Sequence, residues 1–258
     1  MRVISANTNG IRSAAKKGFI SWLRKVRPDV VCIQETKAQE HQLTDEQFNP
    51  NGYFCYYHDA VKKGYSGVAI YSKVKPKKVI EGLGWHDIDI EGRFLELQFE
   101  KLSIISLYMH SGSASEERQA VKFDFMKRFM SHLISLRRKR REYIICGDWN
   151  IVHKRIDIKN WTGNQKNSGC LPEERAWLDK LFGEVGYVDA FRVVNQEPHQ
   201  YTWWSNRGQS WANNVGWRID YQVITPNLQP LVKSASIYKD ERFSDHAPLI
   251  IDYDLELS

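Results

Sequence analysis

Hydrophobic positions along the chain follow two periods, one typical of buried strands and one typical of amphipathic helices. Short, continuous apolar runs occur at residues 30–35, 67–72, 94–99, 102–108, 142–148 and 218–225. Runs of this length that are apolar on both faces predict strands covered on both sides. Because the strands outnumber the helices and are distributed along the whole chain, the pattern predicts an α/β fold.

The first helical period lies near the amino terminus. Phe19, Trp22, Leu23 and Val26 share one face of a helix predicted over residues 14–27, which Pro28 ends.

A long helix is predicted further along, because Ser113 and Glu116 have the spacing of a capping box. Its apolar face comprises Val121, Phe125, Phe129, Leu133 and Leu136, and it ends in the basic run Arg-Arg-Lys-Arg-Arg at 137–141. A third helix is predicted to start after Pro172, with Glu173 and Glu174 in its first turn and with Trp177, Leu178 and Leu181 facing inward.

No fixed-period repeat and no linker rich in Pro, Gly or Ser divides the sequence, so we expect a single domain over residues 1–258. The polar segment 160–169 is predicted to be a loop long enough to be functional. A hydrophobic content of 42% and an aromatic content of 12% allow a large core, which excludes the disordered and low-complexity classes.

Charge and cysteine content narrow the class only a little. The chain has 37 Lys and Arg against 31 Asp and Glu, a net charge of +6, which favours a phosphate-rich partner only modestly. The cysteines Cys32, Cys55, Cys146 and Cys170 form no Cys-x-x-Cys pair, so neither a zinc ribbon nor a redox motif is indicated. No apolar stretch approaches the roughly 18 residues of a membrane span and no signal peptide is recognisable, so we expect a cytoplasmic protein without a membrane partner.

Several predicted strands end in carboxylates, amides or imidazoles. These residues are Asn7, Asn9, Gln34, Glu35, Tyr108, His110, Asp148, Asn150, Asp245 and His246. Any one of them is typical of an ordinary turn. Together they form an oxygen-rich set without a thiolate, and such a set suits Mg²⁺ or Mn²⁺.

The motifs around these strand ends are similar to those of a known family. They read NTNGIR (7–12), QETK (34–37), GYSGVA (64–69), GDWN (147–150), NQKNSG (164–169), LPEER (171–175), VGWRIDY (215–221) and SDHAP (244–248). In this order they resemble the exonuclease III family of apurinic/apyrimidinic endonucleases, over essentially the whole chain. The GDWN motif or the SDH of SDHAP alone would indicate only the wider deoxyribonuclease I-like superfamily, which includes inositol phosphatases and sphingomyelinases.

The resemblance implies a four-layered α/β sandwich, in which two mixed β-sheets pack face to face with helices on the outside. It also implies a hydrolase dependent on Mg²⁺ or Mn²⁺ that acts on double-stranded DNA with abasic sites or damaged 3′ ends. Such an enzyme cleaves the backbone 5′ to an abasic site, removes nucleotides and blocking groups from 3′ ends, or does both. We expect a monomer, because the sequence has no oligomerisation pattern.

Metal ligands are implied by the resemblance at strand ends. Glu35 is the foremost candidate, although a helix cap or an ion pair with Lys37 would also explain it. The other members of the expected set are Asn7, Asp148, Asn150, Asp245 and His246. Asn9 stands where some family members have Asp, so we expect it to act only indirectly on a metal, and one or two ions remain open.

Catalytic roles are likewise implied by the resemblance. Asp148 positions or deprotonates the attacking water, and Asn150 orients it. His246 contacts the scissile phosphate or acts as the general base, with Asp220 holding its ring. Tyr108 contacts phosphate through its hydroxyl. The chain departs from the family after Tyr108, because it has Met-His-Ser-Gly at 109–112 where the family commonly has x-Pro-Asn or x-Pro-Gln.

DNA contacts are implied at a further group of residues. A small apolar pocket for a flipped-out sugar without a base is expected at Trp203, Trp217 and Ile219, although a core role is the default for a tryptophan. Contacts to the DNA backbone are expected from Lys37, Ser111, Asn164, Asn167 and His246. Lys62 and Lys63 are further candidates, whereas the run at 137–141 is typical of a solvated helix end.

Two other functions compete with a DNA-repair nuclease. A phosphodiesterase of the same superfamily acting on phospholipid or inositol phosphate is disfavoured by the basic charge and by the WRIDY segment. A non-catalytic DNA-binding protein is disfavoured because the polar set, with Glu35, Asp148 and His246, is complete. The balance among abasic-site incision, 3′-to-5′ exonuclease and 3′-phosphatase activities depends on loops 108–112, 164–170 and 206–214.

Overall fold

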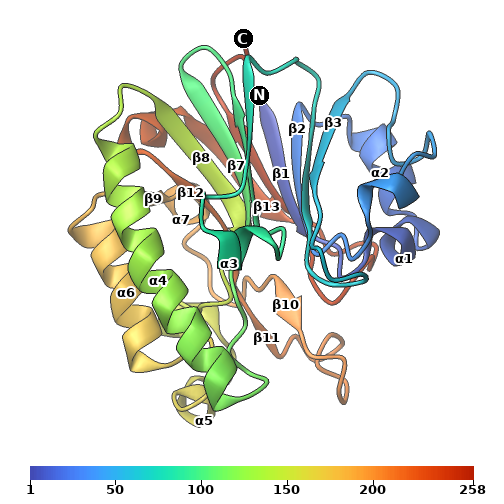
Figure 1. The fold of residues 1–258 in the computed structure, drawn as a ribbon. Coiled ribbons are helices and arrows are strands. Elements are labelled where there is room, and N and C mark those ends of the chain that lie inside the picture. Colours follow the sequence, from blue (N-terminus) through green and yellow to red (C-terminus); the bar gives the residue numbers. More distant parts are fainter.

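The computed structural model describes residues 1–258, which form two six-stranded sheets and a small hairpin (Figure 1). The first sheet has the spatial order β13 (Val232–Ile237), β14 (Leu249–Tyr253), β1 (Arg2–Asn7), β2 (Val30–Gln34), β4 (Val68–Ser72) and β3 (Phe54–His58). The second has the order β5 (Lys78–Glu81), β6 (Phe94–Gln98), β7 (Leu102–Tyr108), β8 (Glu142–Asp148), β12 (Asp220–Ile224) and β9 (Val188–Asp189). The hairpin pairs β10 (Trp203–Trp204) with β11 (Gly216–Trp217).

Both sheets are mixed. The pairs β1·β2 and β7·β8 are parallel, and the other neighbours within the two sheets are antiparallel. The α-helices are α1 (Ile11–Lys16), α2 (Phe19–Val26), α3 (His86–Asp89), α4 (Glu116–Arg137), α5 (Trp161–Asn164), α6 (Pro172–Gly183) and α7 (Ala190–Val194). Short 3-10 turns occur at Glu40–Gln42, Arg155–Asp157 and Pro226–Leu231. No helix is both long enough and apolar enough to cross a membrane.

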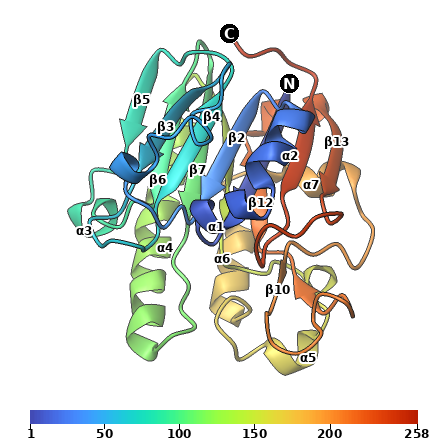
Figure 2. The ribbon, with the colours of Figure 1, turned by 90° about the vertical axis from the view of Figure 1, so that its right-hand side faces the viewer.

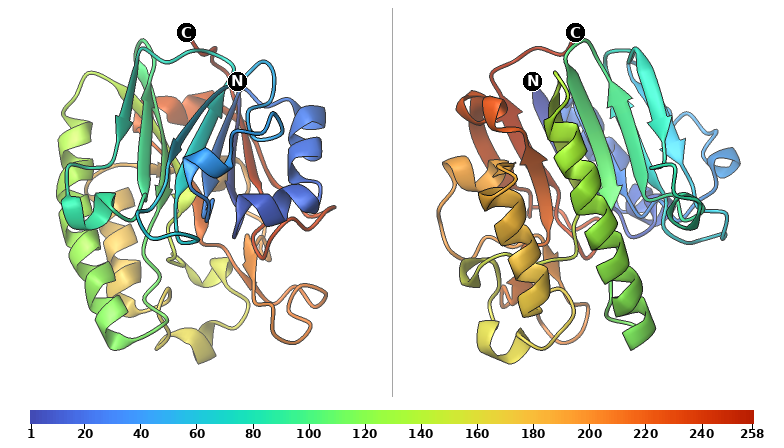
Figure 3. Two further views of the ribbon diagram at one scale, coloured as in Figure 1. Left: turned by 45° about the vertical axis from the view of Figure 1, so that its right-hand side comes forward. Right: turned by 60° about the vertical axis from the view of Figure 1, so that its left-hand side comes forward.

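The two sheets and the helices outside them form four layers, and a separate apolar core lies at each boundary between layers. Ile144 of β8 packs between the two sheets, whereas its neighbour Ile145 packs under α4 and α6. A third cluster lies between the first sheet and α1 and α2. Figure 2 shows α1 and α2 outside the first sheet, and Figure 3 shows α4 and α6 side by side outside the second. The continuous apolar runs therefore reflect strands covered on both faces, and the predicted sandwich is confirmed.

The predicted helix over residues 14–27 is wrong as a single element. The chain forms α1 from Ile11 and then α2 from Phe19, with Gly18 at φ +96° between them. Glycine adopts this left-handed conformation without the Cβ penalty, so the helix axis can turn there. The turn places both short helices against the first sheet.

The start of the long helix also differs from the prediction. Its N-cap is Ser115, whose Oγ accepts a hydrogen bond from the Arg118 amide at 3.3 Å, whereas Ser113 Oγ bonds to Ser111 Oγ. Val121 is 38% exposed, because the inward face at this turn carries Lys122 instead. The segment predicted as a loop at 160–169 begins with the single-turn helix α5.

Strand ends meet at one end of the sandwich, below the sheets in Figure 1 and opposite the two chain termini. Parallel pairing aligns Asn7 with Gln34 and Tyr108 with Asp148 at carboxyl ends. Antiparallel pairing aligns Asp220, the first residue of β12, with Asp148. The fold thus brings polar residues from both sheets to a common edge.

Candidate active site

A carboxamide bridges the two sheets at this edge. Asn7 Nδ2 donates to Glu35 Oε1 at 2.8 Å and to Asp148 Oδ2 at 2.9 Å. The Asn7 oxygen accepts from the Asn9 amide at 2.9 Å. Asn7 therefore spans the two carboxylates through its amide nitrogen, and its ligand role stays a prediction.

Strained backbone surrounds this bridge. Asn9, Glu35, Lys37 and Asn150 have φ of 45°, 50°, 48° and 53°. Left-handed conformations of non-glycine residues cost free energy and persist where surrounding contacts impose them, commonly at functional sites. Here the contacts include bonds from the Gly10 amide to the Glu35 carbonyl at 2.8 Å and from the Lys37 amide to the Ser66 carbonyl at 2.8 Å.

His246 lies between two carboxylates at the floor of the site. Its Nδ1 is 2.8 Å from Asp220 Oδ2, and its Nε2 is 3.8 Å from Asp148 Oδ2. Burial disfavours the imidazolium, but the negative charges of Asp220 and Asp148 outweigh this and raise the pKa of His246 to about 10. The imidazolium is thus the form at neutral pH, with Asp220 fixing its ring.

Asp148 is the most perturbed carboxyl of the group. Burial raises its pKa to about 8, and the charges of Asp220 and Glu35 act in the same direction against the His246 imidazolium. Its Oδ1 accepts from the Asn150 amide at 3.0 Å, while Asn150 Nδ2 donates to the Met109 carbonyl at 2.9 Å. A carboxyl with a pKa near neutrality, in a cleft and beside a histidine, has the properties of an acid–base group.

A cation fits between the carboxylates. One ligand atom each of Glu35, Asp148 and His246 lies within 4.8 Å of the others. The carboxylate oxygens of Glu35 and Asp148 are the hard donors that such an ion prefers, whereas the cationic His246 has no free lone pair while it stays protonated. Three carboxylates (Glu35, Asp148 and Asp220) outnumber the one histidine in the cluster. Lys37 Nζ partly offsets this excess, because it lies 2.8 Å from Glu35 Oε2.

Asp245 lies beside this cluster but not within it. Asn9 Nδ2 donates to its Oδ1 at 2.9 Å, and Trp203 Nε1 donates to its Oδ2 at 3.1 Å. Lys37 Nζ contacts the Asn9 oxygen from the other side. Each Asp245 oxygen therefore has one donor, and the carboxylate supports the Trp203 ring; its ligand role stays a prediction.

Tyr108 is supported from behind by residues that the sequence did not identify. The Arg93 guanidinium lies 4.7 Å from the Tyr108 ring centroid, and Arg93 also bonds Glu91 at 2.5 Å. Burial raises the pKa of Tyr108 well above its usual range, helped by the charge of Glu35, so its hydroxyl stays protonated. His110, where the family commonly has proline, is buried with Nε2 3.1 Å from Glu91 Oε2, and burial lowers its pKa to about 4.

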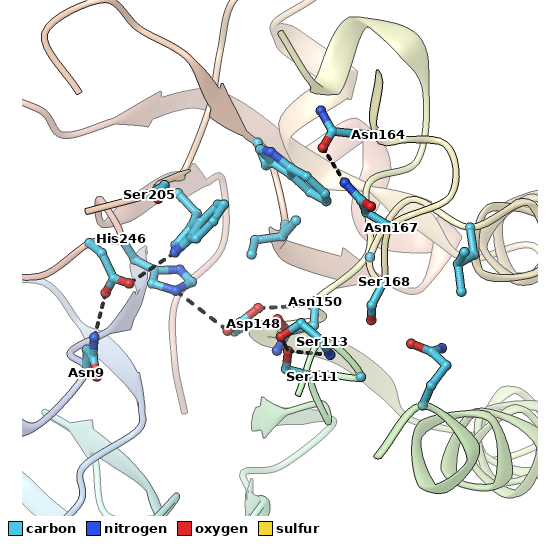
Figure 4. Close-up of a pocket in the computed structure, with 18 of the residues that line it drawn as sticks. Asn9, Ser111, Ser113, Asp148, Asn150, Asn164, Asn167, Ser168, Ser205 and His246 are labelled. Atoms are coloured by element: carbon cyan, nitrogen blue, oxygen red, sulfur yellow. Dashed lines mark hydrogen bonds and ion pairs between the residues drawn. The ribbon is translucent and has the colours of Figure 1, made fainter. Parts of the chain in front are cut away.

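A single cleft gathers the remaining predicted residues (Figure 4). Asn9, Tyr108 and Ser111 lie along it with Glu35, Asp148, Asn150, Asp245 and His246. Its other walls comprise Lys37, Asn164, Asn167, Trp203, Trp217 and Ile219. The main set of residues predicted to contact DNA therefore lines the same cleft as most of the catalytic candidates. The further candidates Lys62 and Lys63, and the run at 137–141, are not among its lining residues.

The cleft walls combine amides with aromatic rings. Asn167 Nδ2 donates to Asn164 Oδ1 at 2.8 Å. Trp203 and Trp217 pair across the β10–β11 hairpin with ring centroids 5.9 Å apart and planes at 89°. Ile219 belongs to the small apolar cluster on which both rings pack. Lys166 and Arg207 also line the cleft, and nothing in the strand pattern marks them.

Family membership follows from comparison with known proteins. The chain belongs to the endonuclease/exonuclease/phosphatase family, whose model matches residues 4–246. An exodeoxyribonuclease of Bacillus subtilis is 38% identical over 96% of this chain and 98% of its own length. DNA repair nuclease APEX1 of Danio rerio is 35% identical over 97% of this chain and 81% of its own length.

Solved structures give the same fold. An AP endonuclease from Archaeoglobus fulgidus superposes with a TM-score of 0.89 at 27% identity, over 99% of this chain and 100% of that one. A 3′-5′ exonuclease from Neisseria meningitidis, at 23% identity and a TM-score of 0.88, supports the fold alone. The predicted family and fold are confirmed, and the chain is an enzyme, a hydrolase of the nuclease type.

Proposed function

We propose that this chain is a metal-dependent DNA-repair phosphodiesterase that cleaves 5′ to abasic sites and trims nucleotides or blocking groups from 3′ ends. The observation that carries the proposal is the cluster of Glu35, Asp148 and His246 at the floor of a cleft walled by amides and tryptophans. The relatives named as exodeoxyribonuclease and DNA repair nuclease support it. As predictions of the same proposal, the protein acts as a monomer in the cytoplasm.

Glu35 and Asp148 would hold a Mg²⁺ or Mn²⁺ ion, with the Asn7 amide spacing them. A bound divalent ion neutralises charge on phosphoryl oxygens and lowers the pKa of water. Which of the two ions the protein uses is set by ligand number and rigidity, and we propose Mg²⁺ as the first to test.

Proton transfer is proposed at the Asp148 carboxylate. The Asn150 amide fixes Asp148 Oδ1, and Oδ2, which accepts one hydrogen bond from Asn7 Nδ2 at 2.9 Å, keeps a lone pair that can accept a proton from the attacking water. His246 donates through Nε2 to the phosphate, because Asp220 holds its Nδ1 and keeps it cationic. The protonated Tyr108 hydroxyl supplies a second neutral donor to phosphate.

Selection of damaged DNA is proposed at the hydrophobic wall. Trp203, Trp217 and Ile219 offer a small apolar surface directly beside the acid–base group. A sugar without a base could be extruded to this surface at low cost, because no base pair has to be broken. Asn164 and Asn167 would hold the adjacent backbone, since amides donate to phosphate without fixing a charge.

The alternative functions receive less support from the cleft. A non-catalytic binding protein would not need the strained backbone and the near-neutral pKa of Asp148. An inositol phosphatase would bind a small, highly charged ligand, and the paired tryptophans suit such a ligand poorly.

One labelled duplex in three forms tests the proposal: an internal abasic site, a recessed normal 3′ end, and a 3′-phosphate at a nick. Each is incubated with Mg²⁺, Mn²⁺ or EDTA, and an inositol phosphate with Mg²⁺ serves as the competing substrate. Metal-dependent cleavage of any duplex form supports the proposal and ranks the three activities. Turnover of inositol phosphate alone, or of no substrate, rejects it.

A further inference from the structure

A buried ion pair lies behind the cleft, outside the cluster proposed to carry the chemistry. Lys122 of α4 and Glu174 in the first turn of α6 both have side chains that are 0% exposed, and Lys122 Nζ is 2.5 Å from Glu174 Oε1. Burial lowers the pKa of Lys122, and the charge of Glu174 opposes this. Apolar residues of similar volume would avoid the cost of burying two charges, so stability alone does not account for the pair.

The lysine contacts the backbone of the segment that follows β8 and carries Asp148 and Asn150, called here the catalytic loop. Lys122 Nζ donates to the Asn150 carbonyl at 2.8 Å. Asn150 has φ +53°, and its amide is the donor that fixes Asp148 Oδ1. Asparagine tolerates this left-handed conformation but does not prefer it. The ammonium therefore helps to hold the residue that orients the acid–base carboxyl.

The glutamate contacts the segment 164–171, which lines the cleft with Asn164 and Asn167 and is called here the amide wall. Glu174 Oε2 accepts from the amides of Gly169 at 2.6 Å and Leu171 at 3.0 Å. These residues end the segment that carries Asn164 and Asn167. The carboxylate therefore fixes the position at which this wall joins α6.

The catalytic loop and the amide wall also contact each other directly at Gly169. A Cβ at that residue would lie 3.1 Å from the Asn150 carbonyl oxygen, and the Gly169 carbonyl accepts from the Val152 amide at 2.7 Å. The ion pair therefore spans a junction where the catalytic loop and the amide wall are in direct contact.

We propose that Lys122 and Glu174 are positioning residues that set the catalytic loop and the DNA-contacting wall relative to each other. The inference rests on the proposed nuclease function. Because the lysine contacts the catalytic loop and the glutamate contacts the amide wall, the two residues act on different steps. Lys122 governs the orientation of Asp148 and hence turnover, whereas Glu174 governs the wall and hence DNA binding.

The test uses Lys122→Met and Glu174→Gln, with kcat measured on an internally abasic duplex in Mg²⁺ and Kd measured on the same duplex in EDTA. Lys122→Met is expected to lower kcat about tenfold with Kd changed less than about twofold, because small displacements of catalytic groups are costly. Glu174→Gln is expected to raise Kd about tenfold. The matched control is Leu133→Ala, a buried change on the same helix, in the apolar core between α4 and the second sheet. It is expected to lower Tm without changing kcat or Kd.

A purely structural pair would give a different outcome. If both variants lower Tm as Leu133→Ala does and keep wild-type kcat and Kd, the proposal is overturned. Should a single variant fail to fold, Lys122→Met/Glu174→Gln removes both buried charges at once and is expected to show both defects. If the wild type does not cut, the nuclease function fails, and the effect of Glu174→Gln on duplex binding still decides the role of the pair.

Discussion

Two buried clusters of charge lie close together in this molecule, and they differ in how their charges are balanced. In one, Asp157 and Asp189 are paired with Arg218 and Arg192 at 2.6–2.8 Å. In the other, Glu35, Asp148 and Asp220 face the single histidine His246. The first cluster has two cations for two anions, whereas the second has a surplus of negative charge.

The pKa values follow this difference. Arg218 and Arg192 overcome the effect of burial and lower the pKa of Asp157 to about 2, whereas burial and neighbouring carboxylates raise the pKa of Asp148 to about 8. A balanced cluster holds segments of the fold together. An unbalanced one can be balanced by a cation, or by a phosphate with its metal, so the difference between the two clusters supports the proposal that Glu35, Asp148 and His246 form the hydrolytic centre.

The largest expected effect is on turnover. Asp148→Asn removes the proton acceptor while keeping the side-chain shape, so kcat on an abasic duplex should fall about 10³-fold to 10⁴-fold, within the range for general-base groups. Duplex affinity in EDTA should be retained, and Tm should stay level or rise, because the raised pKa of Asp148 makes this carboxyl costly to bury at neutral pH. Normal cutting by this variant would contradict the assignment of Asp148.

The matched change in the balanced cluster should affect stability instead. Asp157→Asn leaves Arg218 and Arg192 without a full counter-charge and should lower the free energy of unfolding by about 3–5 kcal/mol in a urea titration. Below the Tm of this variant, kcat should match that of the wild type. A loss of kcat at unchanged Tm would show that the two clusters are not functionally separate.

A divalent metal should raise the free energy of unfolding of the protein by binding at the cluster of Glu35, Asp148 and His246. At a Mg²⁺ concentration about 100 times its Kd, a single site should add about 2.7 kcal/mol to the free energy of unfolding. Glu35→Ala should abolish this gain and raise the Mg²⁺ concentration needed for cutting, whereas Asp157→Asn should keep the full increment. An unchanged Mg²⁺ titration in Glu35→Ala would reject the ligand role of Glu35.

The contributions of Asp157 and Asp148 to the free energy of unfolding should change with pH in opposite directions. Asp157 has a lowered pKa in the fold, so its stabilising contribution, on the order of 2 kcal/mol, is present above pH 3.8 and is lost as the pH falls toward 2. Asp148 has a raised pKa, so its contribution is present below pH 3.8 and is lost as the pH rises toward 8. In EDTA, the Tm of Asp148→Asn relative to wild type should therefore rise between pH 4 and 8; a constant difference would contradict the raised pKa.

The smallest effect is expected in the basic run at 137–141. Arg137 and Arg141 donate to backbone carbonyls of Val185, Phe99 and Leu102, and the run precedes β8, at the other end of this strand from Asp148. Arg138→Gln/Arg140→Gln should change kcat/KM by less than about twofold, because both side chains are exposed and neither lines the cleft. A steep loss of affinity would show that DNA reaches that end of the molecule.

Sequence patterns could predict features that depend on period and strand ends. The alternation that places Ile144 and Ile145 on opposite faces also places Asp148 at the end of β8, beside the end of β7. Resemblance to a family supplied the further residues Asp220 and Trp217, which come from distant segments. The strand ends alone were enough to locate the site.

Features that depend on side-chain partners could not be predicted in this way. Lys122 and Glu174 read as a surface lysine and an ordinary first-turn acid, because nothing local indicates that they meet in the interior. His110 and Arg93 likewise pack behind Tyr108 through contacts between separate strands and loops. At Ser113 the capping pattern was satisfied two residues later, by Ser115.

Turnover of an internally abasic duplex by the wild type, Asp148→Asn and Asp157→Asn, in Mg²⁺ at one temperature below all three Tm values, tests the central claim most directly. We expect the wild type and Asp157→Asn to cut at equal rates and EDTA to stop both, while Asp148→Asn binds the duplex without cutting it. Equal activity of Asp148→Asn and the wild type, or cutting that persists in EDTA, would contradict the claim that the unbalanced cluster is the hydrolytic centre.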